Sequence, residues 1–339
     1  MSRAQLTSTV EQNTGGAVAP FVAGKNKIIN GDFSIWQRGI GAFSTAGSNT
    51  FTADRWQVGS DGSTTASTSQ KTFTPGNAIS GYESTYYLET AITAVGGNNA
   101  YILQRIEDVR AFANQTITIS WYAKCSSGTV SSQGLIVQAF GSYGSGSVVT
   151  AFPTASTITT SWQRFTQTFT VPSISGATIG TNSFLEIQVI RTPTSSTIDL
   201  WGVQVERGPV ATPFTTASGT LQGELALCQR YLPALIGPNQ SIVSLATGTT
   251  STFVTIKMPV TARVAPTGIT IPSLSLFNVF NGSLSTANPT AISFDSSGTD
   301  YVTIAVTTSA GSPTIAAGQA DLFRLNSTGA YILFTGCEL

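Results

Sequence analysis

Histidine is missing from all 339 residues of the chain. Its absence removes the usual general base near neutral pH, the Ser-His-Asp triad and the commonest transition-metal ligand. Acid/base chemistry would have to come from carboxylates, and the adjacent Glu107 and Asp108 would point to opposite faces of a strand. Since no spacing indicates a catalytic carboxylate pair, we expect a protein that binds without catalysis.

Cysteines and long apolar runs are also scarce. Cys125, Cys228 and Cys337 are too few and too scattered for a disulfide framework or a thiolate zinc site, so we expect free, mostly buried thiols. No run of about 18 apolar residues and no signal-peptide pattern occurs, so neither a membrane span nor a secretion signal is predicted. We expect folding in a reducing host cytoplasm.

Charge is the third scarcity. Charged residues make up 9% of the chain and the formal net charge is zero, whereas about a quarter of an ordinary globular protein is charged. A protein without positive excess lacks the electrostatic term that captures nucleic acid, so nucleic acid is not an expected partner. Ser, Thr, Asn, Gln and Gly must cover much of the surface.

What remains predicts an all-β chain with more than one domain. A chain this long exceeds what a single core usually serves, and Gly, Ser, Thr and Asn clusters interrupt it at short intervals, as in antiparallel sandwiches. We predict an N-terminal docking arm over 1–24, a jelly-roll β-sandwich over 25–213, a connector with a short helix over 214–234, and a second C-terminal β-sandwich over 235–339.

The stretch Asn26–Gly39 is predicted to open the first sandwich as a strand that bends at Asn30-Gly31-Asp32, and Ile198–Gly208 is predicted as its last strand. In the strand at Thr116–Lys124 one face should be apolar and the other wet. The other strands predicted before residue 213 are Arg55–Val58, Tyr86–Thr93, Tyr101–Glu107, Gly134–Gly141, Gln163–Val171 and Phe184–Arg191. Polar loops are predicted at Ser60–Gly81, Ser126–Gln133 and Gly141–Ser147.

The connector contains the one predicted helix, Gly219–Tyr231. Leu221, Leu225, Cys228 and Leu232 recur at helical spacing and predict one buried face. That face would pack between the two domains or form a contact near a symmetry axis. Pro233 ends the helix.

Beyond the connector the pattern is again that of strands. Seven are predicted, at Thr252–Pro259, Thr267–Ile271, Leu274–Phe280, Ala291–Asp295, Tyr301–Thr307, Asp321–Leu325 and Tyr331–Phe334. Asn326–Gly329 is predicted as a hairpin turn between the last two. Charges are sparse in this half of the chain, which favours close packing against copies of itself or a partner.

Two motifs and their sequel carry a family resemblance. The stretches NKIINGDFSIWQRG and STIDLWGVQVERGPVATPF, followed by GELALCQRYL, resemble bacteriophage tail-fibre and minor structural proteins whose central domain is similar to jelly-roll carbohydrate-binding modules. The resemblance covers roughly residues 25–231, and the closing AYILFTGCEL resembles the C-terminal β-domain of such proteins. It implies a virion component.

The resemblance directs attention to sugar-binding groups, since glycan recognition uses aromatic faces together with amides and charged groups. The ligand-binding candidates are Tyr86, Tyr122, Gln138, Tyr143 and Arg191. Trp36, Trp56, Trp121, Trp162 and Trp201 are expected mainly in the core.

No cofactor is required by the pattern, but the resembled modules often hold a structural Ca²⁺ between the first turn and the final strand. The matching carboxylates here are Asp32 and Asp199. The alternative is that Asp32 caps its turn and Asp199 accepts a hydrogen bond from a neighbouring strand.

The expected partners follow from the resemblance and from the arm. We expect a homo-oligomer, most simply a homotrimer, that contacts other virion proteins of the tail or neck and a host-surface glycan, with no membrane partner. The arm would dock through its apolar residues, which are Leu6, Val10, Val18, Phe21 and Val22. The alternatives are an architectural head or neck decoration protein without sugar binding, a polysaccharide depolymerase, and, for the arm, a frayed terminus.

Overall fold

The protein is described by a computed structural model covering residues 24–76, 79–280, 286–309 and 316–339. The predicted docking arm, including Leu6, Val10, Val18, Phe21 and Val22, lies outside the described residues. Within them the chain is all-β with one α-helix, as predicted from the sequence. In the described ranges, no helix has the length and apolar character needed to cross a membrane.

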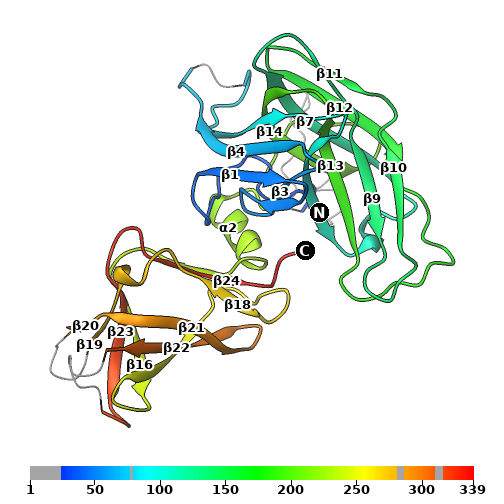
Figure 1. The fold of residues 1–339 in the computed structure, drawn as a ribbon. Coiled ribbons are helices and arrows are strands. Elements are labelled where there is room, and N and C mark those ends of the chain that lie inside the picture. Colours follow the sequence, from blue (N-terminus) through cyan, green and yellow to red (C-terminus); the bar gives the residue numbers. More distant parts are fainter. Residues whose placement is uncertain (1–23, 77–78, 281–285, 310–315) are drawn as a thin grey trace, which may run out of the picture.

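The first domain is a sandwich of two antiparallel six-stranded sheets, which we name sheet A and sheet B (Figure 1). Sheet A has the order β1 (Gly41–Ala46), β4 (Thr65–Thr72), β5 (Tyr86–Thr93), β14 (Ser196–Arg207), β7 (Thr116–Cys125) and β12 (Gln163–Thr170). Sheet B has the order β10 (Ser147–Ala151), β9 (Leu135–Ala139), β13 (Phe184–Thr192), β6 (Ala100–Glu107), β3 (Trp56–Ser60) and β2 (Asn49–Phe51). Strands β8 (Val130–Ser132) and β11 (Ser156–Ile158) form a separate pair.

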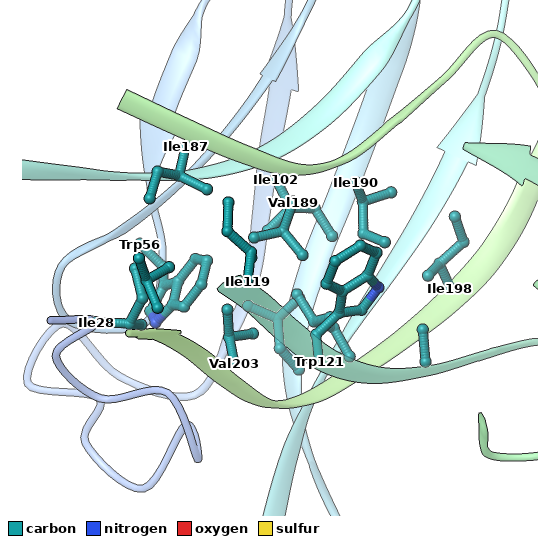
Figure 2. Packing of buried hydrophobic residues seen from close by; sticks show 14 of the residues in the cluster. Ile28, Trp56, Ile102, Ile119, Trp121, Ile187, Val189, Ile190, Ile198 and Val203 are labelled. Atoms are coloured by element: carbon teal, nitrogen blue, oxygen red, sulfur yellow. The ribbon is translucent and has the colours of Figure 1, made fainter. Parts of the chain in front are cut away.

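A dry core fills the space between these sheets (Figure 2). Trp121 and Ile119 of β7 enter it from sheet A, and Ile102 and Ile187 enter it from sheet B. The Trp121 ring stacks on Phe165 with their centroids 5.8 Å apart. The apolar face that the alternation predicts for β7 is therefore confirmed.

The opposite face of β7 is only partly wet: Thr116 is exposed and Tyr122 is half-buried, but the middle of the strand is covered, contrary to the prediction. Thr118 and Ser120 are buried because the chain after β14 returns over them: Thr118 donates to the Gly208 carbonyl, and Arg164 donates both to Ser120 and to the Thr212 carbonyl. These polar side chains can be buried because the Thr118 hydroxyl bonds the returning segment, and the Ser120 hydroxyl bonds Arg164 of β12, which itself donates to that segment.

A β-bulge at Gly202 changes which residues of β14 face the core. Ile198 and Leu200 point inward, the register shifts between Trp201 and Gln204, and Val203 and Val205 then point inward as well. Gly202 has φ +63°, a conformation that glycine adopts without strain. The predicted strand therefore does not alternate without interruption, because one extra residue moves the later side chains to the other face.

Asn26–Gly39 forms no strand, which corrects the sequence-based prediction. It is an irregular segment whose amide side chains replace strand pairing: Asn26 accepts from the backbone of Ile28 and Val205, and Asn30 accepts from Ile35. Buried Ile28 and Phe33 anchor it to the core. Asn and Asp side chains that bond nearby backbone offer an alternative to a sheet ladder.

Two predicted loops contain strands. Ser60–Gly81 includes β4, which joins sheet A between β1 and β5, and Ser126–Gln133 includes β8. Strand β4 was missed because its sequence, TASTSQKT, contains no large apolar residue. Its inner side chains are small, and Thr68 meets Thr90 of β5 at 3.0 Å.

Helix α2 (Leu221–Gln229) forms within the predicted range but turns a different face inward. Glu224 and Cys228 are buried, whereas Leu221 is 66% exposed and Leu225 is 36% exposed. Glu224 is held by two backbone donors, Asn30 N at 2.8 Å and Ser218 N at 2.6 Å. The buried leucine stripe was therefore wrong in its first half, because satisfying buried donors determined the rotation of the helix.

The second domain is a smaller sandwich. Its large sheet has the order β20 (Thr286–Ala287), β19 (Phe277–Phe280), β23 (Ala320–Leu325), β16 (Gln240–Ala246), β17 (Ser251–Lys257), β22 (Tyr301–Thr308) and β21 (Pro289–Ser297). Its small sheet has the order β15 (Ala234–Ile236), β24 (Tyr331–Thr335) and β18 (Gly268–Thr270). The turn Asn326–Gly329 links these two sheets instead of closing a hairpin, because β23 and β24 pair with different strands.

Helix α2 lies between the domains, and the chain end returns to the first domain (Figure 1). Arg38 pairs with Glu338, and Arg263 donates to the Cys337 and Glu338 carbonyls and to Asn182. Polar contacts thus connect the two domains.

All three cysteines are free and buried, as predicted.

Candidate functional site

The outer face of sheet A carries an aromatic patch, defined here as Phe73, Tyr82, Tyr87, Tyr122, Trp162, Trp201 and Phe214. Phe73 packs on Tyr87 and Trp162 at centroid distances of 4.7 and 5.5 Å, and Tyr87 meets Trp162 edge-on at 5.6 Å. Phe73 is buried, while Tyr87 and Trp162 are half-buried. These two rings present aromatic surface to a ligand without leaving their packed positions.

A polar row crosses the same face beside the patch. It consists of Ser69 on β4, Glu89 on β5, Asp199 on β14 and Lys124 on β7, each facing its neighbour in the strand register. Lys124 Nζ lies 3.2 Å from Asp199 Oδ2 and 5.5 Å from the Trp162 ring centre. Lys71 pairs with Glu89 at 3.2 Å. The row therefore offers carboxylates, ammonium groups and a hydroxyl next to aromatic rings.

Burial determines the electrostatics of the row. Desolvation raises the pKa of Asp199, and the Lys124 ammonium opposes that shift. Asp199 Oδ1 is buried and has no hydrogen-bond partner among the described residues. Burial, with the Asp199 and Glu89 charges beside it, raises the pKa of Tyr87 to about 12, so this phenol stays a hydrogen-bond donor at neutral pH.

A cavity of about 430 Å³ continues the face toward the sheet edge. Ser67 and Ala91 line it from β4 and β5, and Ser44 lines it from the edge strand β1. Ser67 and Ala91 face each other two residues beyond Ser69 and Glu89 of the polar row. The face thus runs from aromatic rings through ionic groups to a hollow lined by hydroxyls and small side chains.

The structure does not bring the five predicted ligand-binding residues together. Tyr122 lies in the aromatic patch. Tyr86 shares the inward side of β5 with Leu88, so its neighbour Tyr87 occupies the outer face instead. Gln138 is buried on the inward side of β9 and donates to the Pro172 carbonyl.

The other two predicted residues lie away from sheet A's outer face. Tyr143 is 97% exposed in a loop. Arg191 lies on sheet B, pairs with Asp61 at 3.2 Å and covers the Tyr101 ring. Of the five, Tyr122 alone belongs to the patch.

The predicted calcium ligands have other partners. Asp32 accepts from its near neighbour Ser34 at 2.6 Å, and Asp199 takes Lys124. The described ranges contain no group of three or more His, Cys, Asp or Glu residues arranged to hold a metal ion. The contacts of Asp32 and Asp199 do not test calcium binding, so the calcium site and its alternative, a turn cap at Asp32 and a hydrogen-bonded Asp199, both stay predictions.

Sequence reasoning missed Tyr87, Glu89, Lys124 and Trp162 as site residues. Strand alternation in Tyr86–Thr93 would have placed Tyr87 and Glu89 together on the face opposite Leu88. Their meeting with Lys124 and Trp162 depends on strand order, which the sequence pattern leaves open.

Comparison with protein families found no family model that matches the chain, and no curated protein matches it. Solved structures do share similarity. The CBM22-1 xylan-binding domain from Paenibacillus barcinonensis has 15% identity and a TM-score of 0.31, over 50% of this chain and 96% of that domain. The family 11 carbohydrate-binding module from Clostridium thermocellum has 13% identity and a TM-score of 0.32, over 47% of this chain and 91% of that module.

A phage protein is also similar. Tailspike protein 4 of bacteriophage CBA120 has 12% identity and a TM-score of 0.34 over 54% of this chain, and the match spans 22% of that chain. All three TM-scores are below 0.5, so no residue role and no function follow from these similarities.

Proposed function

We propose that the protein binds a glycan on the outer face of sheet A. The observation that carries this proposal is the polar row of Glu89, Asp199 and Lys124 directly beside the half-buried rings of Tyr87 and Trp162. Sugar rings have an apolar face that packs on aromatic rings and an equator of hydroxyls that needs both acceptors and donors. The face supplies all three kinds of group within one sheet.

Recognition on this face divides between the two kinds of group. Trp162 and Tyr87 contact the apolar side of a sugar, and the carboxylates and ammonium groups exchange hydrogen bonds with its hydroxyls. The cavity lined by Ser67 and Ala91 extends the contact to a neighbouring sugar. Most side chains of this face are held by cross-strand neighbours or ion pairs before a ligand binds, and this reduces the entropic cost of binding.

The direct test is binding of purified full-length protein to host-surface polysaccharides by affinity electrophoresis. Trp162→Ala is expected to abolish the retardation seen with the wild type, because it removes aromatic contact area. Tyr143→Ala is the matched control, since it deletes a fully exposed aromatic side chain outside the face. If Tyr143→Ala abolishes retardation and Trp162→Ala does not, binding belongs to the loop and the proposed site is wrong.

Hydrolysis is the second candidate, because Glu89 and Asp199 face each other across β5 and β14. Directly opposed residues in a sheet have Cβ atoms about 5 Å apart, so two opposed carboxyl groups are close enough to reach the separation of about 5 Å that retaining glycosidases use. Each carboxylate is, however, already bound by a lysine, Glu89 by Lys71 and Asp199 by Lys124, so neither can act on a sugar without first losing that partner. We therefore expect the length of bound polysaccharide to stay unchanged, and shortening that Glu89→Gln abolishes would establish an enzyme instead.

The resemblance of the Asn26–Gly39 and Ile198–Gly208 stretches to phage structural proteins supports a place for this glycan-binding face on a virion, in a tail fibre or tail appendage. In that setting the protein would form a homotrimer and attach through residues 1–24. An architectural head or neck protein would keep the fold without the sugar contact. Imaging the labelled protein on intact particles distinguishes the two positions.

A further inference from the structure

A second cavity, of about 660 Å³, opens between sheet B and helix α2, beside the first described residues. Ile29, Ile106 and Leu227 form apolar parts of its wall. Cavities of roughly 300–1,000 Å³ with apolar walls and a few polar groups are typical small-molecule sites. None of its lining residues belongs to the aromatic patch or the polar row, so this cavity is separate from the proposed glycan site.

Arg55 is the unusual group in the wall. Its side chain is 3% exposed, and its guanidinium carbon lies 3.5 Å from the centre of the Tyr231 ring. Nη2 donates to the Arg105 carbonyl, whereas Nε and Nη1 have no hydrogen-bond partner among the described residues. Because Arg55 has φ +73°, the turn before β3 holds the side chain in place at a conformational cost.

The charges around the cavity do not cancel. Arg105 is paired with Glu186, and Glu107 is paired with Arg230 and also accepts from the Tyr231 hydroxyl. Arg55 and Lys27 also line the cavity, and neither has a carboxylate within 4 Å in the described ranges. The lining therefore has an excess of positive charge beside apolar walls.

We propose that this cavity binds a small carboxylic acid with an apolar body. The carboxylate meets the unpartnered Nη1 of Arg55, with Lys27 contributing at the exposed rim, and the body contacts Ile29, Ile106 and Leu227. Arginine binds carboxylates through short, charge-assisted hydrogen bonds, which are strong where water is excluded. A neutral ligand would leave the positive charge of the buried guanidinium without a counter-ion.

The test is calorimetric titration of the full-length protein with three probes. Phenylacetate carries both features, phenylacetamide lacks the charge, and glucuronate lacks the apolar body. Phenylacetate is expected to bind at least about tenfold more tightly than either of the others, a ratio in the range of one charge-assisted contact. Absence of phenylacetate binding, or equal binding of phenylacetamide, overturns the proposal.

Variants locate the binding. Arg55→Gln removes the positive charge, and Leu227→Trp fills the cavity while the charge of Arg55 stays. Each variant should bind phenylacetate at least about tenfold more weakly than the wild type. Lys27→Ala, at an exposed position, should weaken it less and guards against a folding defect in Arg55→Gln, with the melting temperature recorded for every variant. Arg324→Gln is the matched control, an arginine covering Phe280 in the other domain, and should bind normally. Equal weakening in Arg324→Gln would refute the assignment, whereas a loss confined to Trp162→Ala would move the ligand to the glycan face.

Discussion

The buried carboxylate of Glu224 gives a sharp stability prediction, since it contradicts the helix face that the sequence pattern favours. Its two oxygens accept from Asn30 N and Ser218 N, and the side chain is 2% exposed. Hydrogen bonds to a charged group contribute about 1.5–3 kcal/mol each. Glu224→Ala, which leaves both donors unpaired, should therefore lower the free energy of unfolding by about 3 kcal/mol or more.

Two further variants make this prediction specific. Glu224→Gln keeps one carbonyl acceptor but turns an amide toward the second donor, so its cost should fall between those of wild type and alanine. Leu221→Ala on the same helix removes a side chain that is 66% exposed and should stay within about 0.5 kcal/mol of wild type.

Urea unfolding followed by tryptophan fluorescence is the appropriate assay, because all five tryptophans lie between residues 36 and 201 and report on the first domain. Glu224 contacts that domain through Asn30, so the loss should appear in this signal as a lower transition midpoint. A Glu224→Ala transition at the wild-type urea concentration, or a larger loss in Leu221→Ala than in Glu224→Ala, would refute the assigned helix orientation.

Three other predictions concern side chains seen in the structure, and a fourth concerns the arm predicted from the sequence. Burial raises the pKa of Glu338 to about 7, so the folded state favours the protonated form of this carboxyl. The melting temperature should therefore rise as the pH falls from about 7 toward 4.5, and Glu338→Gln should flatten this dependence. An equal slope in the wild type and the variant would contradict the prediction. Calcium and a chelator should give the same melting temperature while Lys124 holds Asp199; a calcium-dependent rise that Asp199→Ala abolishes would establish the ion. Gly202→Val should cost about 1–2 kcal/mol in urea unfolding, because φ is +63° and a Cβ would lie 3.1 Å from the Tyr122 ring; an unchanged midpoint would exclude strain at the bulge. Deleting residues 1–24 should leave a folded oligomer that no longer joins virions, and normal copy number on particles would show that attachment lies elsewhere.

Strand alternation determined much of the architecture directly from the sequence. Tyr86–Thr93 was located residue for residue, and the dry face of β7 was correct, because large β-branched and aromatic residues repeat with a period of two. The lack of histidine and the scattered cysteines bounded the chemistry in the same local way. Such features depend on residue type and spacing, which the sequence states in full.

The sequence did not reveal the strands and segments that rely on partners. Strand β4 has no apolar pattern of its own and is identified by its pairing with β1 and β5. Asn26–Gly39 contains strand-like apolar residues, yet its asparagine side chains take the backbone bonds that a sheet would have used.

The candidate site depended most on tertiary structure. Tyr87, Glu89, Lys124 and Trp162 are separated by up to 75 positions in the sequence and meet because β14 lies between β5 and β7. Strand order depends on how the whole chain can bury its apolar side chains and pair its buried hydrogen-bonding groups at the same time. No local sequence pattern encodes that choice. The sequence by itself determined the fold class and the kinds of groups available, and only the packed structure decided which of them share a face.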